Sequence, residues 1–310
     1  MISYLVMRFG YYLSIFLGII VFSFLLFHVI PSDPARTILG PNADQAQVEQ
    51  LREKLGLNEP LYRRLGYYLV NVATLKFGHS YVDGRDVFIE IGRRFKVTLS
   101  LITVSMVIVF GYLAVTILTF RFSSLQRWSH AIDFLISSLP VFFSGIIGAI
   151  FVLYFYPVTS FSGNLNSVND LIFLIPPALV LAFYPMSILS GILKEEMSFV
   201  LQSLYITAEK SWGFSDITIL FKYALKNSLI PILSALSNIL PMLLTGAFIV
   251  EIIFSVPGIG SILVKSILEQ DFPMLECTVI VNGAFFVLVN LGFEYLYPLL
   301  DPRTVRGNKI

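Results

Sequence analysis

Long apolar segments alternate with short polar ones along most of this 310-residue chain. Six segments are long enough to cross a lipid bilayer as helices, because a spanning helix needs about 20 apolar residues. A spanning segment must also satisfy its own backbone hydrogen bonds, which favours helices, and the sequence lacks the short alternating strands of a barrel. The predicted spans are residues 9–30, 98–120, 131–156, 171–193, 228–255 and 278–300. The pattern therefore predicts an all-α, polytopic membrane protein with six transmembrane helices.

The polar segment after the first span, residues 31–97, is predicted to fold as an extracytoplasmic subdomain. Asn42 followed by Gln45 is typical of a helix start, and Gly56 can end that helix. A second helix is predicted to begin at Pro60. Two interpretations stay open: the subdomain is a packed cap over the membrane helices, or it also docks an external partner.

The positions of lysine and arginine favour one orientation, because short cytoplasmic loops carry an excess of these residues. With the N-terminus inside, the short outer segments 157–170 and 256–277 contain Lys265 as their one cation. The cations then on the inner side are Arg8, Arg121, Arg127, Lys194, Lys210, Lys222, Lys226, Arg303, Arg306 and Lys309. We therefore expect both termini in the cytoplasm, a cytoplasmic loop over residues 194–227, and one transmembrane domain over residues 1–310.

Composition agrees with a membrane protein and excludes several other classes. Apolar residues make up 56% and charged residues 13% of the chain, whereas soluble domains carry about 25% charged residues. The net charge of +1 says nothing about a nucleic-acid partner, but no basic cluster with interleaved aromatics supports one, so none is expected. The single Cys277 excludes an internal disulfide and a multi-cysteine metal site. After Arg8 the chain is apolar to Ile30 without a cleavage site, which predicts a retained helix.

Motifs for catalysis are missing from the sequence. Gly258-Ile259-Gly260 and the later Lys265 lack the glycine that precedes the lysine of a phosphate-binding loop. The histidines, His28, His79 and His130, are far apart and lack metal-site spacing. We therefore predict no catalytic residue, no metal site and no cofactor on this chain.

Three acidic residues fall within predicted spans, where unpaired charges are costly. We expect Asp133 and Glu251 to lie at the membrane interfaces, and Glu294 to make a structural hydrogen bond. A proton relay is disfavoured because no chain of acids or histidines accompanies them.

Residues 205–231 form a charged, helix-compatible interlude between two apolar spans. Gly213 permits a tight turn between two short helices, and Ser215 or Asp216 can cap the second one. Pro231 is expected to start the next span. The alternative interpretation is an amphipathic helix that lies on the inner leaflet.

Short motifs along nearly the whole chain resemble one family. They are Pro31-Ser32-Asp33-Pro34-Ala35, Leu55-Gly56-Leu57, Phe77-Gly78-His79-Ser80, Leu139-Pro140-Val141-Phe142, the stretch 251–275, Asn290-Leu291 and Asp301-Pro302-Arg303. In this order and spacing the chain resembles the oligopeptide, dipeptide and nickel permeases of ATP-binding-cassette (ABC) importers, and in particular their first permease subunit. The segment Thr207-Ala208-Glu209, before Gly213, departs from the Glu-Ala-Ala that this superfamily favours.

The resemblance implies a type I importer permease in the bacterial plasma membrane, paired with a second homologous permease. It also implies two cytoplasmic ATPases that hold ATP and Mg²⁺, one of them docked on residues 205–220, and an extracytoplasmic solute-binding protein. On this chain the residues expected to meet the ATPase are Tyr205, Ala208, Glu209, Ser211, Trp212, Gly213 and Phe214.

An outer gate is expected in the hairpin over residues 256–273, although a simple tight connection is an equal alternative. The candidate gate residues are Glu251, Pro257, Gly258, Gly260, Asp271 and Pro273. The expected cargo is a peptide, with glutathione and nickel or a metallophore as alternatives. The competing classes are an ion-coupled secondary transporter, for which no inverted repeat is found, and a membrane enzyme.

Overall fold

The computed structural model describes residues 2–29, 34–40, 43–54, 56, 58–120, 123–155 and 171–300, and these are largely helical. The elements are α1 (Ile2–Val29), α2 (Pro34–Leu39), α3 (Gln45–Lys54), α4 (Leu61–Ala73), α5 (Val87–Thr119), α6 (Ser123–Ser137), α7 (Val141–Phe155), α9 (Ile175–Leu201), α10 (Leu204–Ser211), α11 (Asp216–Thr218), the π-helix η1 (Ile219–Ala224), α12 (Leu225–Ile253), α13 (Ile259–Glu269) and α14 (Phe272–Leu300). Within the described ranges, β pairing is limited to one isolated bridge between His79 and Asp86. The predicted all-α fold is confirmed.

Most of the predicted spans fall on single long helices. Among the described residues five helices are long and apolar enough to cross a membrane: α1, α5, α9, α14 and the continuous run Asp216–Ile253. A sixth span is present if α6 and α7 count as one broken span. The predicted loop 157–170 and the motif at 301–303 lie outside the described residues.

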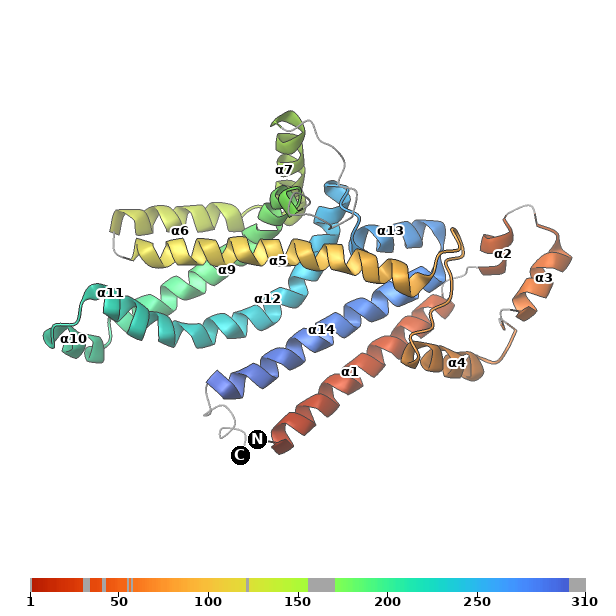
Figure 1. Cartoon of the computed structure of the whole chain (residues 1–310), viewed down its shortest axis with the longest axis horizontal. Helices are drawn as coiled ribbons and strands as arrows, with labels where there is room; N and C mark the ends of the chain where they lie inside the picture. Colours follow the sequence, from red (N-terminus) through yellow and green to blue (C-terminus); the bar gives the residue numbers. More distant parts are fainter. Residues whose placement is uncertain are drawn as a thin grey trace.

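The centre of the bundle is formed by α5, α9 and α12, with Leu101, Leu181 and Ala247 among its buried side chains. α1 and α14 lie side by side along one flank, where Arg8 and Glu294 form an ion pair of 3.3 Å. Glu294 therefore makes a structural contact, as expected. Figure 1 shows α10 and α11 at one end of the long axis, and α2, α3, α4 and α13 towards the opposite end.

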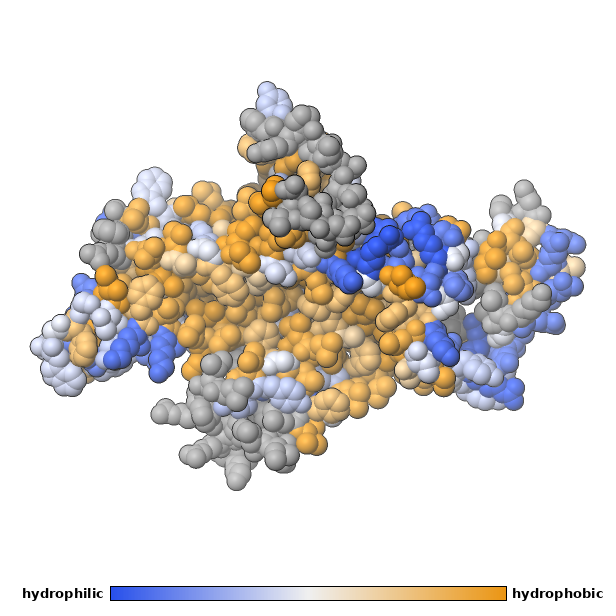
Figure 2. Space-filling view, viewed as in Figure 1, coloured by the Kyte–Doolittle hydropathy of each residue, from blue (hydrophilic) through white to orange (hydrophobic). Residues whose placement is uncertain are grey.

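The surface of the bundle is apolar along its middle and more polar near the two ends of the long axis (Figure 2). Large apolar side chains are exposed on several helices, for example Val107 on α5, Leu153 on α7 and Leu288 on α14. A soluble protein rarely exposes so large an apolar surface, whereas lipid chains solvate it well. The surface thus agrees with a membrane-spanning bundle.

The two helices predicted in the polar segment after α1 are present. α3 ends just before Gly56, whose φ of +64° a glycine adopts without steric strain, and α4 follows Pro60. Asn42 lies outside the described residues. α4 packs against α1 through Tyr68, whose ring lies 5.3 Å from that of Phe24. This helix is therefore a packed cap, and its docking role stays a prediction.

The third predicted span, 131–156, consists of two helices with a sharp bend between them. α6 ends at Ser137, α7 begins at Val141, and the two axes differ by 99°. Pro140 accounts for the break, because proline has no N–H for a helical hydrogen bond and disfavours a helical conformation of the preceding residue. Its carbonyl instead accepts the first backbone hydrogen bonds of α7.

Other boundaries also differ from the prediction. α9 continues to Leu201, so residues 194–201 are helical, and residues 259–269 of the predicted outer hairpin form α13. Pro231 lies inside α12 and does not start it. Hydropathy marks only the apolar part of a helix, so polar turns at its ends escape detection. Prolines inside membrane helices are tolerated because neighbouring groups satisfy the freed carbonyls.

The orientation of the chain can be tested with single cysteines at Lys210 and Lys265. Both positions are exposed, and they lie on α10 and α13 at opposite ends of the bundle. Cys277 is buried, so it should not react with a bulky reagent. In intact spheroplasts a membrane-impermeant maleimide should label Lys265→Cys and should label Lys210→Cys only after permeabilisation. Labelling of Lys210→Cys in intact spheroplasts would reverse the predicted orientation.

Candidate functional site

The predicted coupling segment consists of two short helices joined at a glycine. α10 ends at Ser211, Gly213 has a φ of +85°, and α11 begins at Asp216. Most side chains would be strained at that φ, whereas glycine is not. The Ser215 hydroxyl accepts a hydrogen bond of 3.3 Å from the Thr218 N–H, which caps the second helix as expected.

Several large apolar side chains of this segment are exposed. Leu204 is 89% and Trp212 is 76% exposed, and Tyr205, Phe214 and Ile217 are exposed as well. We call these five residues the coupling surface. Grouped exposed apolar side chains mark a contact with another protein or with a membrane surface.

Small residues accompany the coupling surface, because Ala208 and Ser211 are exposed on α10. Sequence reasoning did not identify Leu204 and Ile217 as part of this surface. Leu204 and Ile217 are exposed in the structure, whereas the nearby Ile206 is 1% exposed and packs α10 against the bundle. That distinction depends on tertiary packing and has no signal in the sequence.

The other predicted residues fasten the segment to the following helix. The Tyr205 hydroxyl accepts a hydrogen bond of 3.1 Å from the Asn227 amide on α12. The Phe214 ring packs edge-on against Tyr223 of η1, with ring centroids 6.3 Å apart, and Glu209 lies beside the same tyrosine. α10 and the turn are therefore expected to move with the start of α12.

The π-helix η1 links α11 to α12 and was not predicted. A π-helix is rare and often occurs at functional positions, because its wider turn changes the register of the helix that follows. The run Asp216–Ile253 is continuous through η1, Pro231 and Pro241. One long element thus leads from the coupling surface to the opposite end of the bundle.

At that opposite end, the start of α13 is held by the buried carboxylate of Glu251. One carboxylate oxygen accepts hydrogen bonds from the backbone N–H groups of Gly260 at 2.7 Å and Ser261 at 3.3 Å. The other oxygen accepts from the Thr98 hydroxyl of α5 at 2.5 Å. That hydroxyl in turn accepts from the Ile259 N–H at 2.9 Å. These N–H groups have no partner within a helix, and the helix dipole favours a negative charge beside them.

The side chain of Glu251 is completely buried between α5, α12 and α13, two residues before the end of α12. Its expected placement at the membrane interface stays a prediction. Two glycines permit this arrangement. A Cβ on Gly258 would overlap the Glu251 carboxylate, and a Cβ on Gly260 would collide with the backbone of Phe248. The structure therefore brings Glu251, Gly258 and Gly260 together in one cluster.

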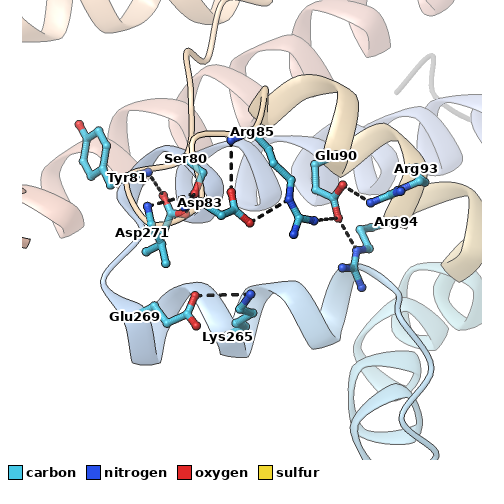
Figure 3. Close-up of polar contacts among 11 residues, drawn as sticks. Ser80, Tyr81, Asp83, Arg85, Glu90, Arg93, Arg94, Lys265, Glu269 and Asp271 are labelled. Carbon is cyan, nitrogen blue, oxygen red and sulfur yellow. Dashed lines mark hydrogen bonds and ion pairs between the residues drawn. The ribbon is translucent and has the colours of Figure 1, made fainter. Parts of the chain in front are cut away.

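Asp271, two residues after the end of α13, provides a second carboxylate contact (Figure 3). Asp271 accepts hydrogen bonds from the Ser80 hydroxyl and from the Tyr81 N–H, the latter at 3.1 Å. Burial raises the pKa of the Tyr81 phenol to about 12. The loop before α5 is thereby fastened to the end of α13.

The two predicted prolines have simpler roles. Pro257 lies in the turn between α12 and α13. Pro273 is the second residue of α14, where its missing N–H costs little because the first N–H groups of a helix are unpaired. Neither is part of the two carboxylate contacts.

Three arginines surround Glu90 in the first turn of α5, as Figure 3 shows. Arg94 donates at 2.8 Å, Arg93 donates to the other oxygen, and Arg85 lies at 3.6 Å. Arg85 also pairs with Asp83 at 3.1 Å. Burial alone would raise the pKa of Asp83, but the N–H and the guanidinium of Arg85 help to lower it below its usual value. These five residues, two acids and three arginines, carry a net positive charge.

In the described part of the chain, no group of three or more histidine, cysteine, aspartate or glutamate side chains could hold a metal ion. The carboxylates of Glu251, Asp271 and Glu90 accept hydrogen bonds from donors of the chain itself.

Comparison with known proteins gives two family matches that together cover nearly the whole chain. Residues 107–306 match the family described as binding-protein-dependent transport system inner membrane component. Residues 1–102 match the N-terminal region of binding-protein-dependent transport system membrane components.

Curated relatives are similar over almost their full length. A putative peptide transport system permease protein of Brucella abortus is 31% identical over 301 residues, covering 94% of this chain and 95% of the relative. The glutathione transport system permease proteins GsiC of Shigella flexneri and of Escherichia coli strain K12 are each 31% identical over 310 residues, covering 97% of this chain and 98% of theirs.

The contacts of α13 join the two matched regions. Thr98 and Ser80 belong to the first region, and their acceptors Glu251 and Asp271 belong to the second. The end of the bundle that contains α13 is thus assembled from both regions.

We predict that the Thr98 hydroxyl is needed to hold α13 in place. Thr98→Val keeps the shape of the side chain but leaves the buried Ile259 N–H without a partner and Glu251 with one donor fewer. Such a loss costs about 1–3 kcal/mol, so the apparent melting temperature of the purified protein should fall. Thr98→Ser keeps the hydroxyl and should melt near the wild type. Equal melting of the valine and serine variants would contradict this role.

Proposed function

Because this chain belongs to the family of binding-protein-dependent transport system inner membrane components, we propose that it is a permease subunit of an ATP-driven importer that carries peptides. The chain resides in the bacterial inner membrane as a multi-pass protein. The observation that supports the proposal best is the exposed coupling surface, which the long helix Asp216–Ile253 connects to the opposite, outer end of the bundle. A peptide cargo is supported by the name of the Brucella relative.

The partners follow from this proposal. A second homologous permease shares the translocation path, and two cytoplasmic ABC ATPases bind and hydrolyse ATP with Mg²⁺. A solute-binding protein delivers cargo at the outer end. This chain contributes no catalytic residue and no cofactor. An apolar, exposed coupling surface at a polar end of the bundle supports the ATPase contact, since water alone would leave it unfavourably solvated.

The mechanism is a mechanical transfer between the two ends of the bundle. When the ATPases close on ATP, α10 and the Gly213 turn move, and they carry the start of α12 through the Tyr205 and Phe214 contacts. The run Asp216–Ile253 has 38 residues and is therefore about 57 Å long. Its far end carries Glu251, which holds α13, so the gate moves with the helix. Such coupling requires contacts that differ between the inward- and outward-facing states.

A second candidate cargo is glutathione, which the names of other relatives support. The permease scaffold proposed for the two cargoes is the same, and the binding protein selects between them. An ion-coupled transporter is disfavoured, since the matched family works with a binding protein.

Reconstitution with the cognate ATPases and binding protein tests the proposal. Proteoliposomes should take up a labelled short peptide only when ATP and the binding protein are both supplied. Excess unlabelled peptide should compete, and glutathione should not. Uptake of glutathione alone would change the cargo and keep the permease assignment. Uptake by the isolated chain in an ion gradient would contradict the proposal altogether.

The coupling segment can be tested separately with two pairs of variants. Ala208→Arg places a long charged side chain on the coupling surface, and Gly213→Pro cannot adopt the φ of +85°. Both should lower ATP-dependent uptake by about tenfold or more, within the usual range of coupling energies, while membrane insertion persists.

The matched controls are Ala208→Ser, which stays small, and Gly213→Asn, because asparagine tolerates a positive φ better than most residues. Both controls should retain most of the uptake. Normal uptake by Gly213→Pro, with the ATPases still bound, would remove the coupling role of this turn.

A further inference from the structure

A second buried polar network lies within the bundle, between α5, α6 and α9. Lys194 of α9 is 2% exposed and its ammonium donates to the carboxylate of Asp133 on α6. The Ser190 hydroxyl donates to the same carboxylate oxygen at 2.8 Å. The Tyr112 hydroxyl of α5 donates to the other oxygen at 2.6 Å. Ser187 also donates to the backbone carbonyl of Asp133, at 3.0 Å.

Asp133 is buried, and its carboxylate accepts hydrogen bonds from side chains of two neighbouring helices, α5 and α9. Its expected placement at the membrane interface stays a prediction. A buried ion pair is weak support for stability, since apolar residues of the same volume often pack as well. Charges inside membrane helices more often mark function. The Asp133–Lys194 pair is therefore better explained by a function than by stability.

The pair lies between the coupling segment and the bend of α6 and α7. Lys194 precedes the end of α9 at Leu201 by seven residues, or about 10 Å, and α10 starts at Leu204. Asp133 precedes the end of α6 at Ser137 by one helical turn. Beyond that end the chain turns by 99° into α7.

α7 then reaches the outer end of α12. Gly145 of α7 lies so close to Ile253 that an added Cβ would come within 2.8 Å of its terminal methyl. Ile253 is the last residue of α12, two positions after Glu251. Packing thus joins α6 to α9 and α7 to both α9 and α12, while the chain itself joins α9 to α10 and α6 to α7.

We propose that the Asp133–Lys194 pair is the joint that makes α6 and α7 follow α9 when the coupling segment moves. The inference rests on the proposed importer function and deepens it. Both residues are positioning residues that act through helix placement. Ion pairing suits this task, because it resists sliding and rotation between α6 and α9 more than apolar contacts do.

The test uses the reconstituted complex and measures solute transported per ATP hydrolysed, a ratio that a merely stabilising pair would leave unchanged. Asp133→Asn strands the Lys194 charge in the interior and is expected to assemble poorly. The double variant Asp133→Asn with Lys194→Met leaves no unpaired charge, so it should assemble. Its transport per ATP should fall by about tenfold, within the usual range of coupling energies.

Two controls accompany the double variant. Lys194→Arg keeps the charge and should retain most of the ratio. Ser137→Ala, at the exposed last residue of α6, should leave it unchanged. A wild-type ratio in the assembled double variant overturns the proposal. If no ATPase co-purifies with the wild type, the importer function itself fails, which is a distinct result.

A distance measurement keeps the proposal testable if the double variant does not assemble. Spin labels at Trp128 on α6 and Phe199 on α9 replace side chains that are 71% and 77% exposed. In an otherwise wild-type complex their separation should stay the same between the nucleotide-free and ATP-trapped states. A change in this separation shows that α6 does not follow α9 and overturns the proposal.

Discussion

Carboxylates buried in a helical bundle must receive the hydrogen bonds that water would otherwise supply, and this requirement decides how the long helices are joined. Glu251 takes its donors from α5 and α13, and Asp133 takes its donors from α5 and α9. The donors on α5, Thr98 and Tyr112, are 14 residues apart, or about 21 Å along the helix. α5 therefore contributes one donor to each of the two buried carboxylates and joins both to the same helix.

The sequence predicted the outline of the fold well, because hydropathy and helix signals are local. The apolar runs, the glycine turn at Gly213 and the helix after Pro60 follow from single residues or short patterns, and the structure has all of them. The burial of Asp133 and Glu251 did not follow. Their donors lie far away in the chain, and single-sequence patterns carry no signal for such pairing.

The errors in the helix boundaries have a common physical origin. Hydropathy reports the solvent around a segment, whereas a helix ends where its backbone hydrogen bonds end. Residues 194–201 and 259–269 are helical although they are polar or lie in a predicted loop. Proline acts differently at two positions: Pro140 breaks a helix, whereas Pro231 lies within one. A proline is tolerated inside a membrane helix where groups of neighbouring helices satisfy the freed backbone carbonyls, and the sequence around the proline does not show this.

The attachment of α13 limits how relatives of this protein can recombine. Its donors Ser80 and Thr98 come from the first hundred residues, and its acceptors Glu251 and Asp271 come from near the other end of the chain. A crossover between two homologous genes, anywhere from the codon of Thr98 to that of Glu251, would take the hydroxyls of Ser80 and Thr98 from one parent. The carboxylates of Glu251 and Asp271 would then come from the other parent. Divergence of either partner thus constrains the other, so the two ends of the gene are expected to be inherited as one unit.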